Sequence, residues 1–118
     1  MAANPVLLCI HRDPDRMRVL QENGYELLTA ATGQEALGVL GTRPVDAIVL
    51  EYNDGLCDGS AVASEIKQVR PNIPIVMLAE PEELPVSSRH AVDVLVSKSD
   101  PPYFVWAAVH FALIMGQV

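Results

Sequence analysis

Several carboxylates follow directly after a short apolar run in the middle of the chain. Glu51 comes after Ala47–Leu50, and Asp54 and the pair Asp58-Gly59 come a few residues later. Four small or β-favouring apolar residues in a row are typical of a buried central strand, which puts Glu51 at its carboxyl end. In open α/β sheets, this edge is where ligands bind and chemistry takes place. The spacing therefore predicts a functional site around Glu51.

The elements that would position this site alternate along the chain as strands and helices. Continuous apolar stretches predict strands over residues 6–10, 25–30, 45–52, 74–79 and 92–97. Signals for four helices lie between or after these strands. The first helix would begin after the cap Asp13 with Pro14 and end at Gly24, and the second would begin at the capping box Thr32 to Glu35 and end at Gly41. The third would cover Ser60–Val69 and stop before Pro71, and the last would start at Pro101-Pro102. This alternation implies right-handed βαβ units and a parallel sheet. With no linker or repeat, residues 1–118 are expected to form a single α/β domain.

The connection between the last two expected strands departs from this regular pattern. Pro85 lies in the middle of residues 80–90, where it would remove a helical hydrogen bond and clash with the preceding turn. Such a proline costs about 3 kcal/mol in a helix interior. We therefore expect the fourth helix to be shortened or irregular.

Composition and charge argue against several classes of function. The formal net charge is -7 and the eight Lys and Arg residues form no cluster, which argues against a nucleic-acid partner. Residues 6–10 lack the length and basic leader of a secretory signal, and residues 103–115 fall short of the ~20 needed to span a bilayer. Two cysteines, Cys9 and Cys57, make no disulfide framework of the secreted type. The expectation is a cytoplasmic protein without membrane contact.

Several segments together resemble the receiver domains of two-component response regulators. They are Ile10–Pro14, Gly24–Glu26, Ala31–Leu37, Asp58-Gly59 and Ser97-Lys98, spread over the chain. The resemblance implies a doubly wound, flavodoxin-like (βα)5 fold with a five-stranded parallel sheet in the order 2-1-3-4-5. It also implies a signal-transduction module of the phosphorelay type and not an enzyme.

The chemistry that this resemblance implies is the transfer of a phosphoryl group to an Asp. In the family, an acidic pair and the acceptor hold Mg²⁺ through oxygen ligands, and a Lys neutralises charge on the transferred group. A Thr or Ser at the end of the fourth strand then turns toward the phosphate, and an aromatic residue on the fifth strand follows it inward.

This chain departs from the family at most of those positions. The position of the acidic pair holds His11 and Arg12, and an acid, Asp13, comes one position later. Glu51 stands at the position of the acceptor and Ala79 at that of the Thr or Ser. Leu95 replaces the aromatic residue, and Ser99 replaces the Pro after the Lys. Lys98 and the Asp58-Gly59 turn are retained. A cation at position 12 repels a metal, and Ala79 offers no hydroxyl to a phosphate. The Mg²⁺ site and conventional phosphorylation are therefore expected to be lost, with no cofactor, as in a pseudo-receiver.

Other interpretations of these acids and bases remain open. Glu51 would mimic a phosphorylated acid, or would form an ion pair with Arg12 or Lys98 that only keeps its charge satisfied. Alternatively, Glu51 or Asp54 still accepts a phosphoryl group, with a divalent metal held by Asp13. Arg12 and Lys98 would also suit an anion in a ligand pocket.

Two weaker hypotheses concern His11 and Cys57. His11 would ligate a soft metal together with Cys57, Glu51 or Asp54, but no short ligand spacing such as Cys-x-x-Cys is present. A His at a strand end is more often a hydrogen-bonded polar residue, so no metal is expected. A redox role for Cys57 lacks a neighbouring second cysteine and an activating base.

The last expected helix, within residues 103–115, is apolar on nearly all sides. A sheet covers only one face of such a helix, so the other is expected to form an exposed apolar patch of the kind that marks partner sites. The candidate interface residues are Tyr103, Phe104, Trp106 and Phe111. They would contact other signalling proteins or a second copy in a homodimer. In the alternative, Trp106 and Phe111 fold inward while Ala107 and Ala108 face water.

Overall fold

Five parallel strands form one sheet in the order β2-β1-β3-β4-β5, as expected from the sequence. The computed structural model describes residues 4–10, 13–52, 59–80, 82–83 and 91–116. The strands are β1 (Val6–Ile10), β2 (Glu26–Thr29), β3 (Ala47–Glu51), β4 (Ile75–Leu78) and β5 (Val94–Val96). The helices are α1 (Pro14–Glu22), α2 (Gly33–Thr42), α3 (Gly59–Val69) and α4 (Tyr103–Gly116). The strand order and parallel pairing confirm the flavodoxin-like prediction.

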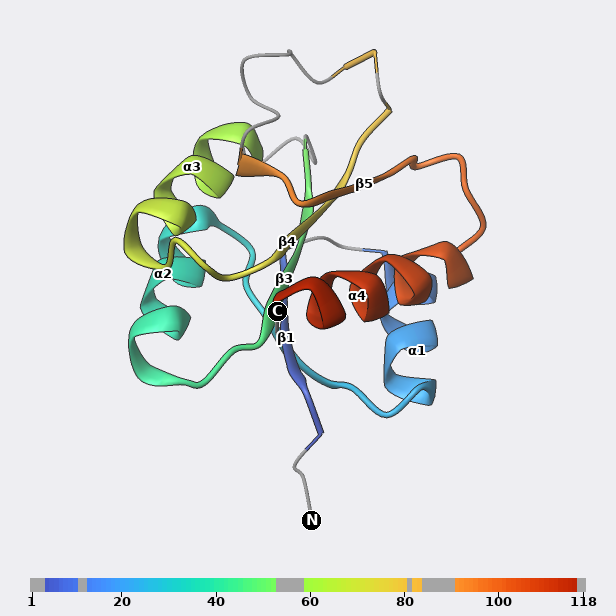
Figure 1. Cartoon of the computed structure of the whole chain (residues 1–118), viewed down its shortest axis with the longest axis horizontal. Helices are drawn as coiled ribbons and strands as arrows, with labels where there is room; N and C mark the ends of the chain where they lie inside the picture. The colour runs from blue at the N-terminus through green and yellow to red at the C-terminus, as the bar shows by residue number, and fades with distance from the viewer. Residues whose placement is uncertain (1–3, 11–12, 53–58, 81, 84–90, 117–118) are drawn as a thin grey trace.

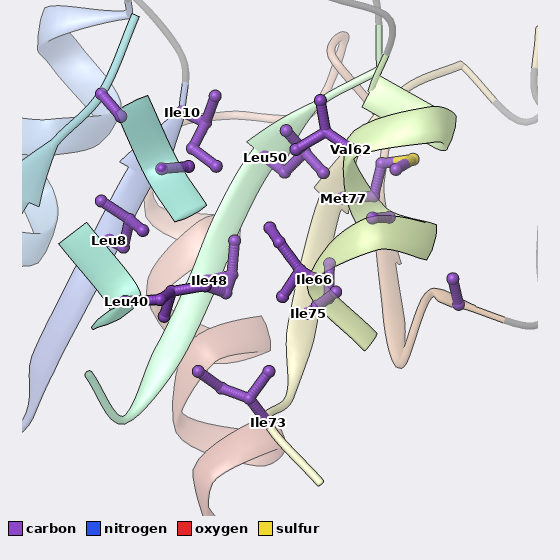
Figure 2. Packing of buried hydrophobic residues seen from close by; sticks show 14 of the residues in the cluster. Leu8, Ile10, Leu40, Ile48, Leu50, Val62, Ile66, Ile73, Ile75 and Met77 are labelled. Carbon is purple, nitrogen blue, oxygen red and sulfur yellow. The ribbon is translucent and has the colours of Figure 1, made fainter. Parts of the chain in front are cut away.

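Helices cover both faces of the sheet, with α2 and α3 on one face and α1 and α4 on the other (Figure 1). Successive residues of a strand point to opposite faces, so the apolar run of β3 serves two cores. Ile48 and Leu50 pack in the cluster under α2 and α3, which Figure 2 shows. Ala47 and Val49 pack in the cluster under α1 and α4. The run is continuous because both faces are buried.

The predicted helix ends are found with one exception. Asp13 caps α1, Thr32 caps α2, and Gly24 follows α1 with φ 90, the only positive φ among the residues that the structure describes. In α2, however, Gly41 does not end the helix, which continues to Thr42. The end comes at Arg43, whose backbone is extended and whose N–H donates to the Val39 carbonyl. A glycine marks a helix end only where a positive φ is needed.

The connection between β4 and β5 is described only in part. Residues 81 and 84–90 lie outside the described residues, so the predicted shortened or irregular fourth helix stays a prediction. Where the chain is described, Glu83 N–H donates to the Glu80 carbonyl at 2.9 Å and forms a turn.

Across the described ranges, every helix is too short or too polar to cross a lipid bilayer.

Candidate functional site

Glu51 lies at the carboxyl end of β3 and faces a cation from a distant part of the chain. Its Oε2 is 3.9 Å from Lys98 Nζ, just after β5, and Lys98 Nζ is also 3.6 Å from Glu83 Oε1. Because β3, β4 and β5 run parallel, their carboxyl ends bring these three side chains to one edge of the sheet. The Glu51–Lys98 ion pair that the sequence suggested is therefore present. The ammonium lies between two carboxylates.

Asp13, the other acid of the expected pocket, is the N-cap residue of α1. Its Oδ1 accepts hydrogen bonds from the backbone N–H groups of Asp15 and Arg16, at 3.0 and 3.4 Å. Its Oδ2 forms an ion pair with the Arg16 guanidinium. The carboxylate therefore caps a helix and neutralises a buried cation at the same time.

Arg16 is a buried guanidinium that links α1 to the segment after β5. Its Nη2 donates to the carbonyl oxygens of Lys98 and Asp100, at 2.8 and 3.3 Å. Its Nε has no hydrogen-bond partner. Arg16 had no predicted role in the sequence analysis. The signal available was a basic residue at a core-facing position three residues after the cap.

Glu80 forms a second cluster that the sequence did not predict. Its carboxylate accepts from Ser97 Oγ at 2.9 Å, from Ser99 N at 3.0 Å and from Ser99 Oγ at 2.9 Å. The hydrogen bonds from Ser97 and Ser99, with a smaller contribution from the charge of Lys98, hold the pKa of Glu80 below its usual value. The one sequence signal was the pair of serines on either side of Lys98.

The positions that the resemblance assigned to the Thr or Ser and to the aromatic residue hold apolar side chains. Ala79 is fully buried directly after β4, in the cluster under α2 and α3. Leu95 of β5 is half-buried and packs against the same cluster. Neither side chain carries a hydroxyl that would contact a phosphoryl group.

Gly59 lies where the chain passes close to the end of β3. Its N–H donates to the Tyr52 carbonyl at 2.6 Å, and a Cβ at this position would come within 2.5 Å of the Glu51 carbonyl oxygen. The close approach explains why the retained Asp58-Gly59 turn ends in glycine. His11, Arg12, Asp54, Cys57 and Asp58 lie outside the described residues, so the hypotheses on them are untested.

The donors that the structure describes do not fit Mg²⁺. This hard cation takes several oxygen ligands in octahedral geometry. Here Asp13 is paired with Arg16, and Glu51 faces Lys98. Among the described residues, no group of three or more His, Cys, Asp or Glu side chains is arranged to hold a metal ion.

The last helix presents its large apolar side chains to the surface. Val105, Ala108, Val109 and Ala112 pack against the sheet and α1. The opposite side exposes Tyr103, Phe104, Trp106, Phe111, Ile114 and Met115, hereafter the α4 face. Phe111 is 54% exposed and Trp106 38%, whereas Ala108 is buried. The inward-folded alternative is therefore wrong for Trp106, Phe111 and Ala108, although Ala107 is exposed as it predicted.

Comparison with known sequences agrees with this architecture. The family model of the response regulator receiver domain matches residues 16–98. The chain is 30% identical over 83 residues to the transcriptional regulatory protein GlrR of Escherichia coli K12, covering 67% of this chain and 19% of GlrR. It is 36% identical over 64 residues to the alkaline phosphatase synthesis transcriptional regulatory protein PhoP of Bacillus subtilis, covering 54% of this chain and 27% of PhoP. The matched part is thus only a fifth to a quarter of these relatives.

Solved structures give the same result over nearly the whole chain. The response regulator TrrA of Thermotoga maritima, in complex with Mg²⁺ and BeF, has a TM-score of 0.76 at 28% identity and covers 92% of this chain and 98% of TrrA. A putative response regulator of Chloroflexus aurantiacus has a TM-score of 0.77 at 24% identity, covers 94% of this chain and 98% of its own, and supports the fold alone.

Proposed function

The chain belongs to the response regulator receiver domain family, and from this premise we propose that it signals through protein–protein association without conventional phosphorylation. The observation that carries the proposal is the pairing of the pocket acids with cations of the same chain. Asp13 is held by Arg16, and Glu51 faces Lys98. Receiver domains are generally signalling modules and not enzymes, which agrees with this role.

Phosphoryl transfer would need rearrangement at each of these positions. The acceptor oxygen must lie in line with the leaving group, and a metal must bridge the transferred oxygens. Glu51 projects its carboxylate one methylene farther than an Asp would, and Asp13 is engaged in capping α1. Ala79 adds no hydroxyl. These features support the interpretation that the Mg²⁺ site has been lost.

We propose a second copy of the chain as the occupant of the α4 face. The six side chains of this face expose on the order of 500 Å², taking about 150–250 Å² for a whole aromatic side chain. That area lies within the ~300–600 Å² of the largest apolar patch on a typical monomer, which is often functional, and below the ~800 Å² per partner of a stable interface, so polar surface around it would have to contribute. Between Tyr103 and Gly116 the helix carries no acidic residue in its first turn and no basic residue in its last turn.

The same part of the surface carries both a protrusion and a hollow. Phe111 and Met115 border a cavity of about 530 Å³ that is also lined by Pro71, Pro74 and Val94. A second cavity of about 360 Å³ shares both prolines and reaches Leu113 of α4. An isologous dimer needs one patch that is complementary to itself, and exposed aromatic side chains beside a hollow of mixed polar and apolar lining support that arrangement.

The test of the α4 face is sedimentation equilibrium of the wild type and Phe111→Ala. The wild type is expected to form dimers, and the variant to raise the dissociation constant at least tenfold, since buried aromatics dominate interface energies. Val69→Ala, which truncates an exposed apolar residue on α3, serves as the matched control and should leave dimerisation unchanged. A wild type that stays monomeric at 100 µM would assign the face to another protein and overturn the homodimer.

The test of the pocket is intact-mass analysis after incubation with Mg²⁺ and acetyl phosphate, beside a conventional receiver domain. No adduct is expected on this chain while the control is phosphorylated. One added phosphoryl group that is hydroxylamine-labile and disappears in Glu51→Gln or Asp54→Asn would establish the alternative, a receiver still phosphorylated at an atypical acid with a divalent metal.

The proposed setting of the module is the cytoplasm. Two cysteines without a disulfide framework suit a reducing compartment. A net charge of -7 supports partners that are proteins and not nucleic acids.

A further inference from the structure

We infer that the loop of residues 97–100, between β5 and α4, is fastened in one arrangement by two internal charges, the carboxylate of Glu80 and the guanidinium of Arg16. The inference rests on the proposed function and specifies its regulation: α4 is presented constitutively, and no phosphoryl group is needed to order the loop in front of it. The two charges come from different parts of the chain, one from the segment after β4 and one from α1.

Glu80 holds the loop at two of its residues. Both carboxylate oxygens lie within hydrogen-bond distance of Ser97 Oγ, at 3.0 and 2.9 Å. One oxygen also accepts from the backbone N–H and the hydroxyl of Ser99. A charged acceptor forms stronger hydrogen bonds than a neutral one, so a single side chain supplies most of the attachment on this side.

Arg16 holds the two remaining residues of the loop. Its Nη2 binds the carbonyl oxygens of Lys98 and Asp100, and its other terminal nitrogen binds Asp13. The guanidinium thus sits among three oxygen atoms in a buried position. Carbonyl oxygens at a loop would otherwise need water or another donor, so the cation satisfies them and fixes their direction at once.

The loop closes on itself and passes directly into α4. Asp100 N–H donates to the Ser97 carbonyl at 3.1 Å, and Asp100 Oδ2 accepts from Ser97 N–H at 3.3 Å. Three residues after Asp100, α4 begins at Tyr103, and its Val105 and Val109 are fully buried against the sheet. Fastening the loop therefore fixes where the first turn of α4, and the α4 face with it, emerges.

Amide hydrogen exchange of the whole chain, followed by NMR at Ser97, Ser99 and Asp100, tests this inference. Glu80→Ala and Arg16→Met remove one fastening each, and Met retains the apolar stem of Arg16. We expect each to speed exchange of the loop amides at least tenfold, with exchange in β1 and β3 within twofold of the wild type. The matched controls are Glu82→Ala, an exposed acid beside Glu80, and Arg18→Met, an exposed cation on α1; both should leave the loop unchanged.

Loop amides that exchange at the wild-type rate in both Glu80→Ala and Arg16→Met would overturn the inference. If circular dichroism shows that either variant does not fold, Ser99→Ala is used in its place, because it removes only an exposed hydroxyl. This variant should raise the exchange rate of the backbone amide at position 99 several-fold. Exchange is measured without a phosphodonor, and the comparison is repeated in the Phe111→Ala background, which weakens dimerisation. It therefore gives its answer whether or not the chain dimerises through the α4 face or accepts a phosphoryl group.

Discussion

At the scale of single residues, the described carboxylates Asp13, Glu51 and Glu83 at the carboxyl edge of the sheet each face a cation of the same chain. Lys98 lies between Glu51 and Glu83, and Arg16 forms an ion pair with Asp13. Removing one partner of such a pair leaves the other uncompensated, which costs more than the pair contributes when both are present. The described part of the pocket is therefore a mutually paired set of residues.

Glu80 makes stability depend on pH in a defined direction. Hydrogen bonds from Ser97 and Ser99 lower its pKa in the folded chain, so it stabilises the fold above the unfolded value of about 4.3. That contribution is lost as the pH falls through the lowered pKa. Urea unfolding should show Glu80→Gln less stable than the wild type at pH 7, with the difference shrinking between pH 5 and pH 3. Glu82→Gln should show no such trend, and a gap that persists at pH 3 would contradict the expectation.

Cys9 is expected to be chemically inert in the folded chain. It is fully buried in β1, and burial raises the pKa of its thiol to about 12, so almost no thiolate forms at neutral pH. In a Cys57→Ser variant, a thiol reagent such as DTNB should label Cys9 only at the rate of unfolding. The same variant in urea provides the fully reactive control. Labelling in native buffer at the rate of a free cysteine would show that β1 is not buried as described.

At the scale of elements, the start of α3 at Gly59 depends on the absence of a side chain. In Gly59→Ala, a Cβ would meet backbone atoms of Glu51 and Tyr52 at 2.5–2.7 Å, and backbone cannot move aside cheaply. We expect a loss of about 2–3 kcal/mol in the free energy of unfolding. Gly38→Ala in α2 meets nothing within 4 Å and should gain about 0.5–1 kcal/mol from helix propensity. Denaturant unfolding of the two variants measures whether the free energy of unfolding falls in Gly59→Ala and rises in Gly38→Ala.

Local sequence signals predict most helices and strands, but they predict neither the hydrogen bonds of Arg16 to the loop after β5 nor those of Glu80 to the serines of that loop. Asp13 and Thr32 cap helices because their side chains reach N–H groups two or three residues away, a relation visible in sequence. Arg16 instead bonds to a carbonyl 82 residues later, and Glu80 to serines 17 and 19 residues later. Contacts of that kind depend on how β4, β5 and α1 are arranged, which no local pattern encodes. The Glu51–Lys98 pair was foreseeable only because parallel strands bring their carboxyl ends together.

At the scale of the whole molecule, the unusual feature is a final helix with an apolar surface on both sides. The sequence predicted that one side would be exposed and named Tyr103, Phe104, Trp106 and Phe111, which are exposed, but it left open whether Trp106 and Phe111 fold inward. The alternation of small and large side chains decides it, because Ala108 and Ala112 allow α4 to lie close to the sheet. The bulky Trp106 and Phe111 are then directed outward.

Association through this surface should make thermal stability depend on protein concentration. A dimer that binds only folded chains stabilises them by mass action. If the dissociation constant lies below 1 µM, raising the concentration from 1 to 100 µM should raise Tm by about 5 °C. Differential scanning calorimetry should show this shift in the wild type and Val69→Ala and little of it in Phe111→Ala. A Tm that is independent of concentration in the wild type would contradict dimerisation.

The burial of Ala79 limits which side chains position 79 can accept. Its side chain is fully enclosed by the core under α2 and α3, and directly after it Glu80 is bonded to the serines around Lys98. A mutation that restored a hydroxyl at position 79 would have to fit extra atoms into a filled core while the neighbouring acid still held the loop. An Asp regained at position 51 would meet neither a partner hydroxyl nor a vacant metal ligand at Asp13. Under the proposed function, neither change alone would allow phosphorylation, so the two would have to occur together and with a new arrangement at Asp13.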